Sequence, residues 1–125
     1  MRRVADEQPG YPCRISLTDA APDDEVILTR YEHHAVDSPF RSSYAIYVRQ
    51  GEQRYDEVDR VPAMLRSRML SARVFDADGI LVSADLVDGS ELESMIDRLF
   101  ADQRAAYLHV HFAKPGCYAA LVERA

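Results

Sequence analysis

Two histidines, His109 and His111, stand two residues apart in the segment Tyr-Leu-His-Val-His-Phe near the end of the sequence. The alternation with apolar residues predicts a β-strand, in which side chains at positions i and i+2 point to the same face. Their Cα atoms would be about 7 Å apart, which lets both rings reach one metal ion at about 2.0–2.1 Å. Because an unperturbed imidazole has a pKa near 6.5, the pair could instead transfer protons or bind a substrate without a metal.

A stable metal site needs a third ligand, and no C-x-x-C or H-E-x-x-H motif in the sequence identifies one. His33 and His34 are the candidate nitrogen ligands. Consecutive side chains of an extended strand point to opposite faces, so we expect only one of the two to join the pair. Glu32 and Asp37 are candidate oxygen ligands, and the ion would be a divalent transition metal.

A candidate anion-binding segment is Ser-Pro-Phe-Arg-Ser-Ser, which contains Arg41, Ser42 and Ser43. A guanidinium among small residues with hydroxyl and backbone N–H groups suits a carboxylate or a phosphate. An ordinary surface arginine bound to backbone carbonyls is the alternative. The sequence therefore offers a small anionic ligand as a candidate partner.

The register of the last hairpin determines whether Cys117 lies on the same face as His109 and His111. A two- or four-residue turn around Pro115-Gly116 places His111 opposite Ala120 and His109 opposite Val122. One face then carries Leu108, Val110, Phe112, Cys117, Ala119 and Leu121, and the other carries Tyr107, His109, His111, Ala113, Tyr118, Ala120 and Val122. In this register Cys117 is a small buried residue apart from the histidines, whereas a three-residue loop would reverse the faces. We also expect Cys13 to be a buried thiol, with no disulfide between the two cysteines.

Periodicity and turn residues predict the elements that must position these side chains. Strands are expected at Arg14 to Leu17, Glu25 to Glu32, Tyr44 to Arg49, Leu70 to Phe75, Ile80 to Val87, Tyr107 to Ala113 and Tyr118 to Glu123. Pro62 suits the first turn of a short helix that buries Met64 and Leu65. A capping box of Ser90 and Glu93 begins a second helix with an apolar face of Leu92, Met95, Ile96, Leu99 and Phe100.

These elements predict a single α+β domain over residues 11–125, with a mostly antiparallel sheet of about six to seven short strands and two helices. The polar residues 1–10 are expected to fray or to lie as an extended arm. A chain of 125 residues with 47% hydrophobic residues is long and apolar enough for its own core.

The net charge of the chain limits the kinds of partner that it can bind. The 21 acidic and 15 basic residues give a net charge of −6, which opposes the phosphate contacts that nucleic-acid binding requires. No apolar run approaches the roughly 20 residues that cross a bilayer. We therefore expect a cytoplasmic protein with no nucleic-acid or membrane partner.

Four separated blocks resemble, in the same order, a bacterial family catalogued as domain of unknown function 1203. The blocks are Gly10 to Leu17, Tyr31 to His33, Ser38 to Ser43, and His109 to His111 with Pro115 to Tyr118. The resemblance covers nearly the whole chain and implies no activity, substrate or cofactor. It implies that several of the family's recurrent polar positions meet in space, namely Cys13, His33, Arg41, His109, His111 and Cys117. His34 departs from the polar residue usual at its position, which weakens a ligand role for it.

Three hypotheses of function follow. The first is a small enzyme or small-molecule binder in which His109 and His111 form the pocket floor, His33 transfers protons and Arg41 holds an anion. The second is a non-enzymatic interaction module, such as a homodimer, with structural histidines. The third is a metal-binding protein built on His109 and His111.

Overall fold

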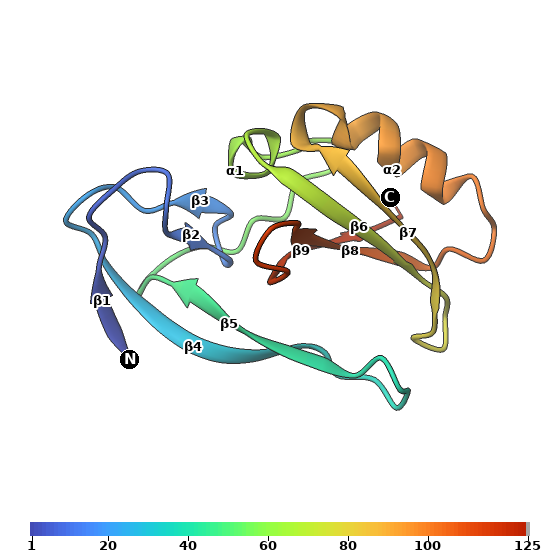
Figure 1. Cartoon of the computed structure of the whole chain (residues 1–125), viewed down its shortest axis with the longest axis horizontal. Coiled ribbons are helices and arrows are strands. Elements are labelled where there is room, and N and C mark those ends of the chain that lie inside the picture. Colours follow the sequence, from blue (N-terminus) through green and yellow to red (C-terminus); the bar gives the residue numbers. More distant parts are fainter. Residues whose placement is uncertain (125) are drawn as a thin grey trace.

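Two β-sheets face each other in the computed structural model, which describes residues 1–124 (Figure 1). In this part of the chain, sheet A has five strands and sheet B has four. Sheet A contains, in spatial order, β1 (Arg2–Val4), β4 (Glu25–His34), β5 (Ser42–Val48), β2 (Pro12–Cys13) and β3 (Thr18–Asp19). Sheet B contains β7 (Leu81–Asp88), β6 (Met69–Phe75), β8 (Tyr107–Phe112) and β9 (Tyr118–Glu123). Neighbouring strands are antiparallel, except that β2 and β5 are parallel.

The α+β class is confirmed, but the strands form two sheets where one was expected. The nine strands within residues 1–124 also exceed the predicted six to seven. The additional strands are β1, β2 and β3, which have only two or three residues each. So short a segment carries too little alternation of apolar and polar residues to be recognised from sequence.

The strand predicted for Arg14 to Leu17 is wrong. These residues form a turn that connects β2 to β3. Leu17 has a φ of 54°, which lies in the left-handed region and ends any extended strand. Its side chain nevertheless packs against the main core. Leu17 therefore packs against the core from a turn, although the alternation of apolar residues predicted a strand here.

The first residues of the chain pair with sheet A. Arg2–Val4 align antiparallel with residues 25–27 of β4. Ala5 is buried, and its N–H donates to the Asp24 carbonyl at 2.9 Å.

The main apolar core lies between one face of sheet B and the helices α1 (Ala63–Arg66) and α2 (Leu92–Phe100). Met64 and Leu65 are buried on α1, as predicted. The predicted apolar face of α2 is also confirmed, since Leu92 is in the core and its other members pack against the buried residues. No helix within residues 1–124 is long and apolar enough to cross a membrane.

The predicted capping box of α2 is wrong. Asp88 Oδ1 accepts hydrogen bonds from the Ser90 N–H at 3.0 Å and from the Ser90 hydroxyl at 2.8 Å. A short 3-10 turn, Gly89–Glu91, then leads into the helix. The aspartate caps this 3-10 turn, because it stands at the end of β7, two residues before the N-cap position expected from sequence.

Contacts at opposite ends of the molecule join the sheets. At one end, the Ser38 hydroxyl on the β4–β5 turn donates to the Gly79 carbonyl on the β6–β7 turn at 2.9 Å. At the other, Arg68 forms an ion pair with Asp19 of β3, with the closest nitrogen and oxygen 2.6 Å apart. Figure 1 shows the long β4–β5 hairpin running beneath sheet B between these two ends.

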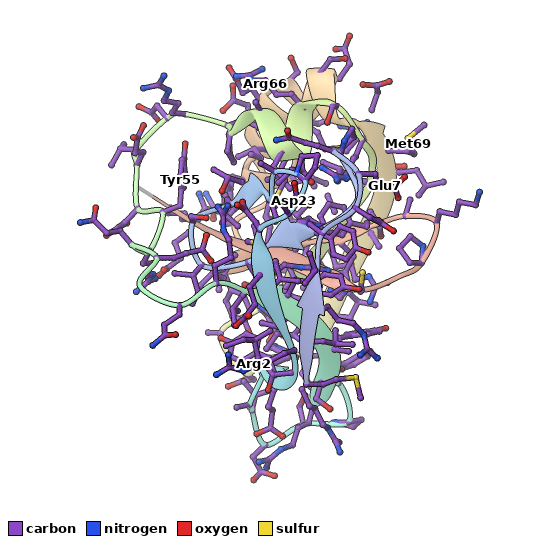
Figure 2. All side chains as sticks on the ribbon, turned by 90° about the vertical axis from the view of Figure 1, so that its left-hand side faces the viewer. Arg2, Glu7, Asp23, Tyr55, Arg66 and Met69 are labelled. Carbon is purple, nitrogen blue, oxygen red and sulfur yellow. The ribbon has the colours of Figure 1, made fainter. Side chains whose placement is uncertain are left out.

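The polar region between Gln50 and Arg60 is a loop that extends outward from the body of the molecule, with Tyr55 labelled on it in Figure 2. The Tyr55 N–H donates to the Ile15 carbonyl at 2.8 Å, and its hydroxyl donates to the Arg60 carbonyl at 2.8 Å. The loop is therefore attached to the turn after β2 while most of its side chains stay in solvent.

Candidate functional site

The face of sheet B that looks toward sheet A is rich in imidazole and aromatic rings. In the sheet register, His109 of β8 pairs with Arg73 of β6, and His111 pairs with Ser71. Paired residues of antiparallel strands point to the same side. The neighbouring residue Val110 lies in the main core on the opposite face. The two histidines therefore share a face, as their spacing predicts, and this face is covered by sheet A.

A β-bulge in β4 turns two consecutive histidines toward sheet B. Tyr31 pairs with Tyr44 and His34 pairs with Ser42, so β4 has one more residue than β5 in this interval. The His33 ring centroid lies 5.5 Å from that of His109, and the His34 centroid lies 4.9 Å from it. The expectation that His33 and His34 point to opposite faces is wrong, because the extra residue breaks the alternation.

His33, His109 and His111 form a cluster with the geometry of a metal site. Each offers a ring nitrogen, and these three nitrogens lie within 4.8 Å of one another. Nitrogens that share one tetrahedral ion at about 2.0–2.1 Å are about 3.3 Å apart. Small rotations of the side chains would therefore close the cluster around an ion.

The hydrogen bonds leave free nitrogens in this cluster. The Gly116 carbonyl lies 2.9 Å from His111 Nδ1, and since a carbonyl only accepts, Nδ1 carries the proton and Nε2 keeps its lone pair. Within residues 1–124, Nδ1 of His33 and Nδ1 of His109 are buried without a hydrogen-bond partner. Buried polar atoms without partners are rare in folded proteins and call for an explanation such as a bound ion.

His34, by contrast, has a partner at each ring nitrogen. Its Nδ1 donates to the Phe40 carbonyl at 2.8 Å, and its Nε2 shares a hydrogen bond of 2.6 Å with the Tyr107 hydroxyl. This side chain joins β4 to β8 as a structural residue. Only one of the two consecutive histidines is left for a ligand, although both face the same way.

Burial determines the charge of the cluster. Removal from water lowers the pKa of His109 to about 3 and the pKa of His33 and of His111 to about 4. All three rings are therefore neutral near pH 7, which is the form that coordinates a metal.

Tyrosine rings surround the cluster. The Tyr118 ring stacks on His33 with centroids 4.7 Å apart, and the Tyr44 ring lies 5.3 Å from His33 and 5.6 Å from His111. Burial raises the pKa of Tyr118, so its phenol stays neutral. These rings limit the access of water to the imidazoles.

A cavity of about 280 Å³ opens beside the cluster. Its walls come from both sheets and from the β4–β5 turn, and they consist of His33, His34, Phe40, Ser42, Arg73, Phe75, Leu81, Ala84 and His111. The cavity thus has two cluster histidines at one side, a cation from β6, and largely apolar walls.

Arg41 lies outside this cavity. Its exposed guanidinium donates to both carboxylate oxygens of Glu32, at 2.9 and 3.0 Å. The Ser43 hydroxyl accepts from Arg30 Nε at 3.0 Å, while Ser42 lines the cavity but donates its hydroxyl to the Phe40 carbonyl at 2.8 Å. Glu32 is therefore engaged by an arginine, and neither it nor Asp37 belongs to the histidine cluster.

Sequence reasoning missed Arg73. Its only sequence signal is a charged residue at the centre of an apolar strand, flanked by the buried Ala72 and Val74. Such a residue points away from the core, but its proximity to the histidines depends on the pairing of β6 with β8. That pairing joins segments more than thirty residues apart, and no local pattern predicts it.

The predicted register of the last hairpin is wrong, because the loop of residues 113–117 is longer than the two or four residues assumed and β9 also contains a bulge. Val110 pairs with Ala120 and His111 pairs with Tyr118, which leaves Ala119 as the extra residue. Ala120 and Val122 therefore turn to the core, and Leu121 pairs with His109 and is 43% exposed.

The two cysteines lie apart from the histidines. Cys117 packs against the main core, on the face of the hairpin opposite His111, and its sulfur accepts from Arg14 Nη2 at 3.2 Å. Cys13 is fully buried in a second core cluster of sheet A. Both are free thiols, in agreement with the sequence-based expectation.

The family model described as "Protein of unknown function (DUF1203)" matches residues 10–124, so the chain belongs to this family. This confirms the resemblance of the four sequence blocks. The comparison with curated proteins finds no match, and neither does the comparison with solved structures.

Proposed function

We propose that this member of the DUF1203 family binds one divalent transition-metal ion through His33, His109 and His111. The observation that carries the proposal is the convergence of three ring nitrogens within 4.8 Å, two of them on residues with a buried, unpartnered Nδ1. A bound ion would supply the missing partners. The Gly116 carbonyl would fix the tautomer of the third ligand, as acceptors behind metal-binding histidines usually do.

The ligand set indicates the class of metal. Neutral imidazoles suit zinc, copper, iron and nickel, whereas magnesium and calcium prefer oxygen ligands. The cluster found within residues 1–124 contains neither a thiolate nor a carboxylate. We therefore expect an ion of the zinc or iron class.

Three protein ligands leave a coordination position open. Structural zinc sites usually have four protein ligands, whereas catalytic sites have three and keep one position for water or substrate. The cavity beside His33 and His111 provides space for such a ligand. We propose that the centre binds or activates a small molecule at this open position.

A metal-free acid–base role has less support. A general base works best when its pKa lies near the working pH. Burial keeps the pKa values of His33, His109 and His111 at about 3 to 4. Association into a homodimer stays a prediction.

Metal content tests the proposal. We expect protein purified without a chelator and without a histidine tag to contain about one transition-metal ion per chain by elemental analysis. A titration of metal-free protein with Co²⁺ should give saturable absorption bands in the visible range. Absence of saturable binding in folded wild-type protein would overturn the proposal.

Two matched variants sharpen this test. In His111→Asn the amide nitrogen can still donate to the Gly116 carbonyl, but the ring nitrogen Nε2 is lost. In His34→Asn the donor to Phe40 can be kept in the same way, and the lost Nε2 is the one bonded to Tyr107. We expect at least a tenfold loss of Co²⁺ affinity in the first variant and near wild-type affinity in the second, with folding of both checked by circular dichroism. Equal affinities in the two folded variants would contradict the assignment of the ligands.

A further inference from the structure

We propose that the cavity beside the histidine cluster binds a small organic carboxylate, and that the guanidinium of Arg73 holds its carboxylate group. The approach of this anion to a metal ion rests on the function proposed above. The anion site itself rests on Arg73 and the cavity walls. The arginine expected from sequence, Arg41, lies in the β4–β5 turn, whereas Arg73 lies on β6.

The placement of Arg73 is set by the sheet. Arg73 pairs with His109 on one side and with Ala84 of β7 on the other, so its side chain leaves the same face of sheet B as the histidine. It lines the cavity together with His33 and His111. A molecule held by this guanidinium would therefore lie directly beside the cluster.

The charge of Arg73 is not neutralised within the described protein. No hydrogen bond or ion pair links its guanidinium to another residue within 1–124, whereas Arg41 and Arg68 each hold a carboxylate. The cavity walls contain no acidic residue, and Arg73 is half-buried. A half-buried cation beside neutral imidazoles creates a positive potential that attracts an anion, and a metal dication on the histidines would strengthen it.

The walls favour an organic acid over an inorganic anion. A guanidinium binds the two oxygens of a carboxylate through parallel hydrogen bonds, and it can bind phosphate in a similar way. Phe40, Phe75 and Leu81, however, provide apolar surface for the rest of a molecule. The volume of about 280 Å³ equals that of roughly nine water molecules, which fits a small aromatic or aliphatic acid.

Benzoate is a suitable probe, with benzamide as its neutral isostere and inorganic phosphate as the competing anion. We expect benzoate to bind metal-free wild-type protein saturably by NMR titration, at lower concentration than benzamide or phosphate. Arg73→Met should weaken benzoate binding at least tenfold, and Arg73→Lys should fall in between because it keeps the charge but loses the fork. The matched control Arg41→Met, outside the cavity, should bind benzoate like the wild type. Folding of each variant is checked by its thermal unfolding without ligand.

The outcomes separate this inference from the proposed metal centre. Equal binding of benzoate and benzamide, unchanged binding in folded Arg73→Met, or weakened binding in Arg41→Met would overturn the anion site. Tighter binding of phosphate than of benzoate would overturn the inference that the ligand is an organic acid. With Co²⁺ bound, benzoate should change the visible absorption bands, and unchanged bands at saturating benzoate would overturn its approach to the metal. Failure to bind Co²⁺ with retained benzoate binding would overturn the metal centre and leave the Arg73 site standing.

Discussion

Tyr118 of β9 stacks on His33 of β4, with ring centroids 4.7 Å apart and ring planes at 21°. The two residues belong to different sheets, and the histidine is the sole member of the cluster that sheet A supplies within residues 1–124. The candidate metal centre is therefore complete only when the sheets are docked against each other. Metal binding and docking of the sheets should stabilise each other.

We predict that a bound metal raises the stability of the whole fold. Zn²⁺ at a free concentration of 100 times its Kd should add about 2.7 kcal/mol to the free energy of unfolding. Differential scanning calorimetry with and without Zn²⁺ measures this as an increase in Tm. With its affinity at least tenfold lower, His111→Asn should gain no more than about 1.4 kcal/mol at the same Zn²⁺ concentration, and His34→Asn should keep the full increase. An unchanged Tm in wild-type protein would argue against an ion that bridges the sheets.

Substitution of Tyr118 should separate the role of its ring from that of its hydroxyl. Tyr118 is 8% exposed, so Tyr118→Ala would leave a large cavity and cost about 3 to 5 kcal/mol. Tyr118→Phe keeps the ring on His33 and should cost less than about 1.5 kcal/mol. Denaturant unfolding curves compare the two. A large loss in Tyr118→Phe would show that the hydroxyl, not the stacking, stabilises this region.

The ion pair between Arg68 and Asp19 should matter far more than a surface pair. Its side chains are 20% and 12% exposed, and it links β3 to the segment after α1. Arg68→Met would leave a largely buried carboxylate without its partner and should cost about 3 kcal/mol or more. The matched control is Arg2→Met, because the Arg2–Glu25 pair is 75% and 56% exposed and should contribute about 0 to 1 kcal/mol. Chemical denaturation of both variants checks this order, and similar losses would contradict it.

The two thiols should react at different rates with a disulfide reagent at pH 8. Cys13 is fully buried, and burial raises its pKa to about 11, so it should react only when the protein opens. Cys117 is only partly buried and should react first. The absorbance of released thiolate should show one fast equivalent in native protein and two in denaturant. Cys117→Ser should remove the fast phase, and loss of that phase in Cys13→Ser would refute the prediction.

Local patterns predicted much of sheet B. Alternating apolar residues predicted the strands β6 and β7, which pair as a hairpin around an Asp-Gly turn where Gly79 has a φ of 76°. The i, i+2 spacing predicted that His109 and His111 share a face. These features depend on residues close together in sequence, which is why sequence reasoning reaches them.

The remaining features depend on contacts between distant segments or on irregular strands. The bulges near His33 and at Ala119 carry no glycine or proline that would mark them. Arg73 reaches the cluster only through the pairing of β6 with β8. His33 is the candidate ligand because the ring nitrogens of His34 are bonded to Phe40 and Tyr107. These bonds bring together β4, the β4–β5 turn and β8, which are far apart in the sequence.

Because of the bulge in β4, the number of residues in this stretch decides which side chains face sheet B. Removal of one residue between Tyr31 and His34 would restore regular pairing with β5, and the imidazole now facing sheet B from position 33 would turn outward or be lost. Such a deletion would leave the composition almost intact. A deletion of Glu32 should therefore lower metal affinity as a substitution of His33 would, whereas a point substitution of Glu32, which keeps the extra residue, should not.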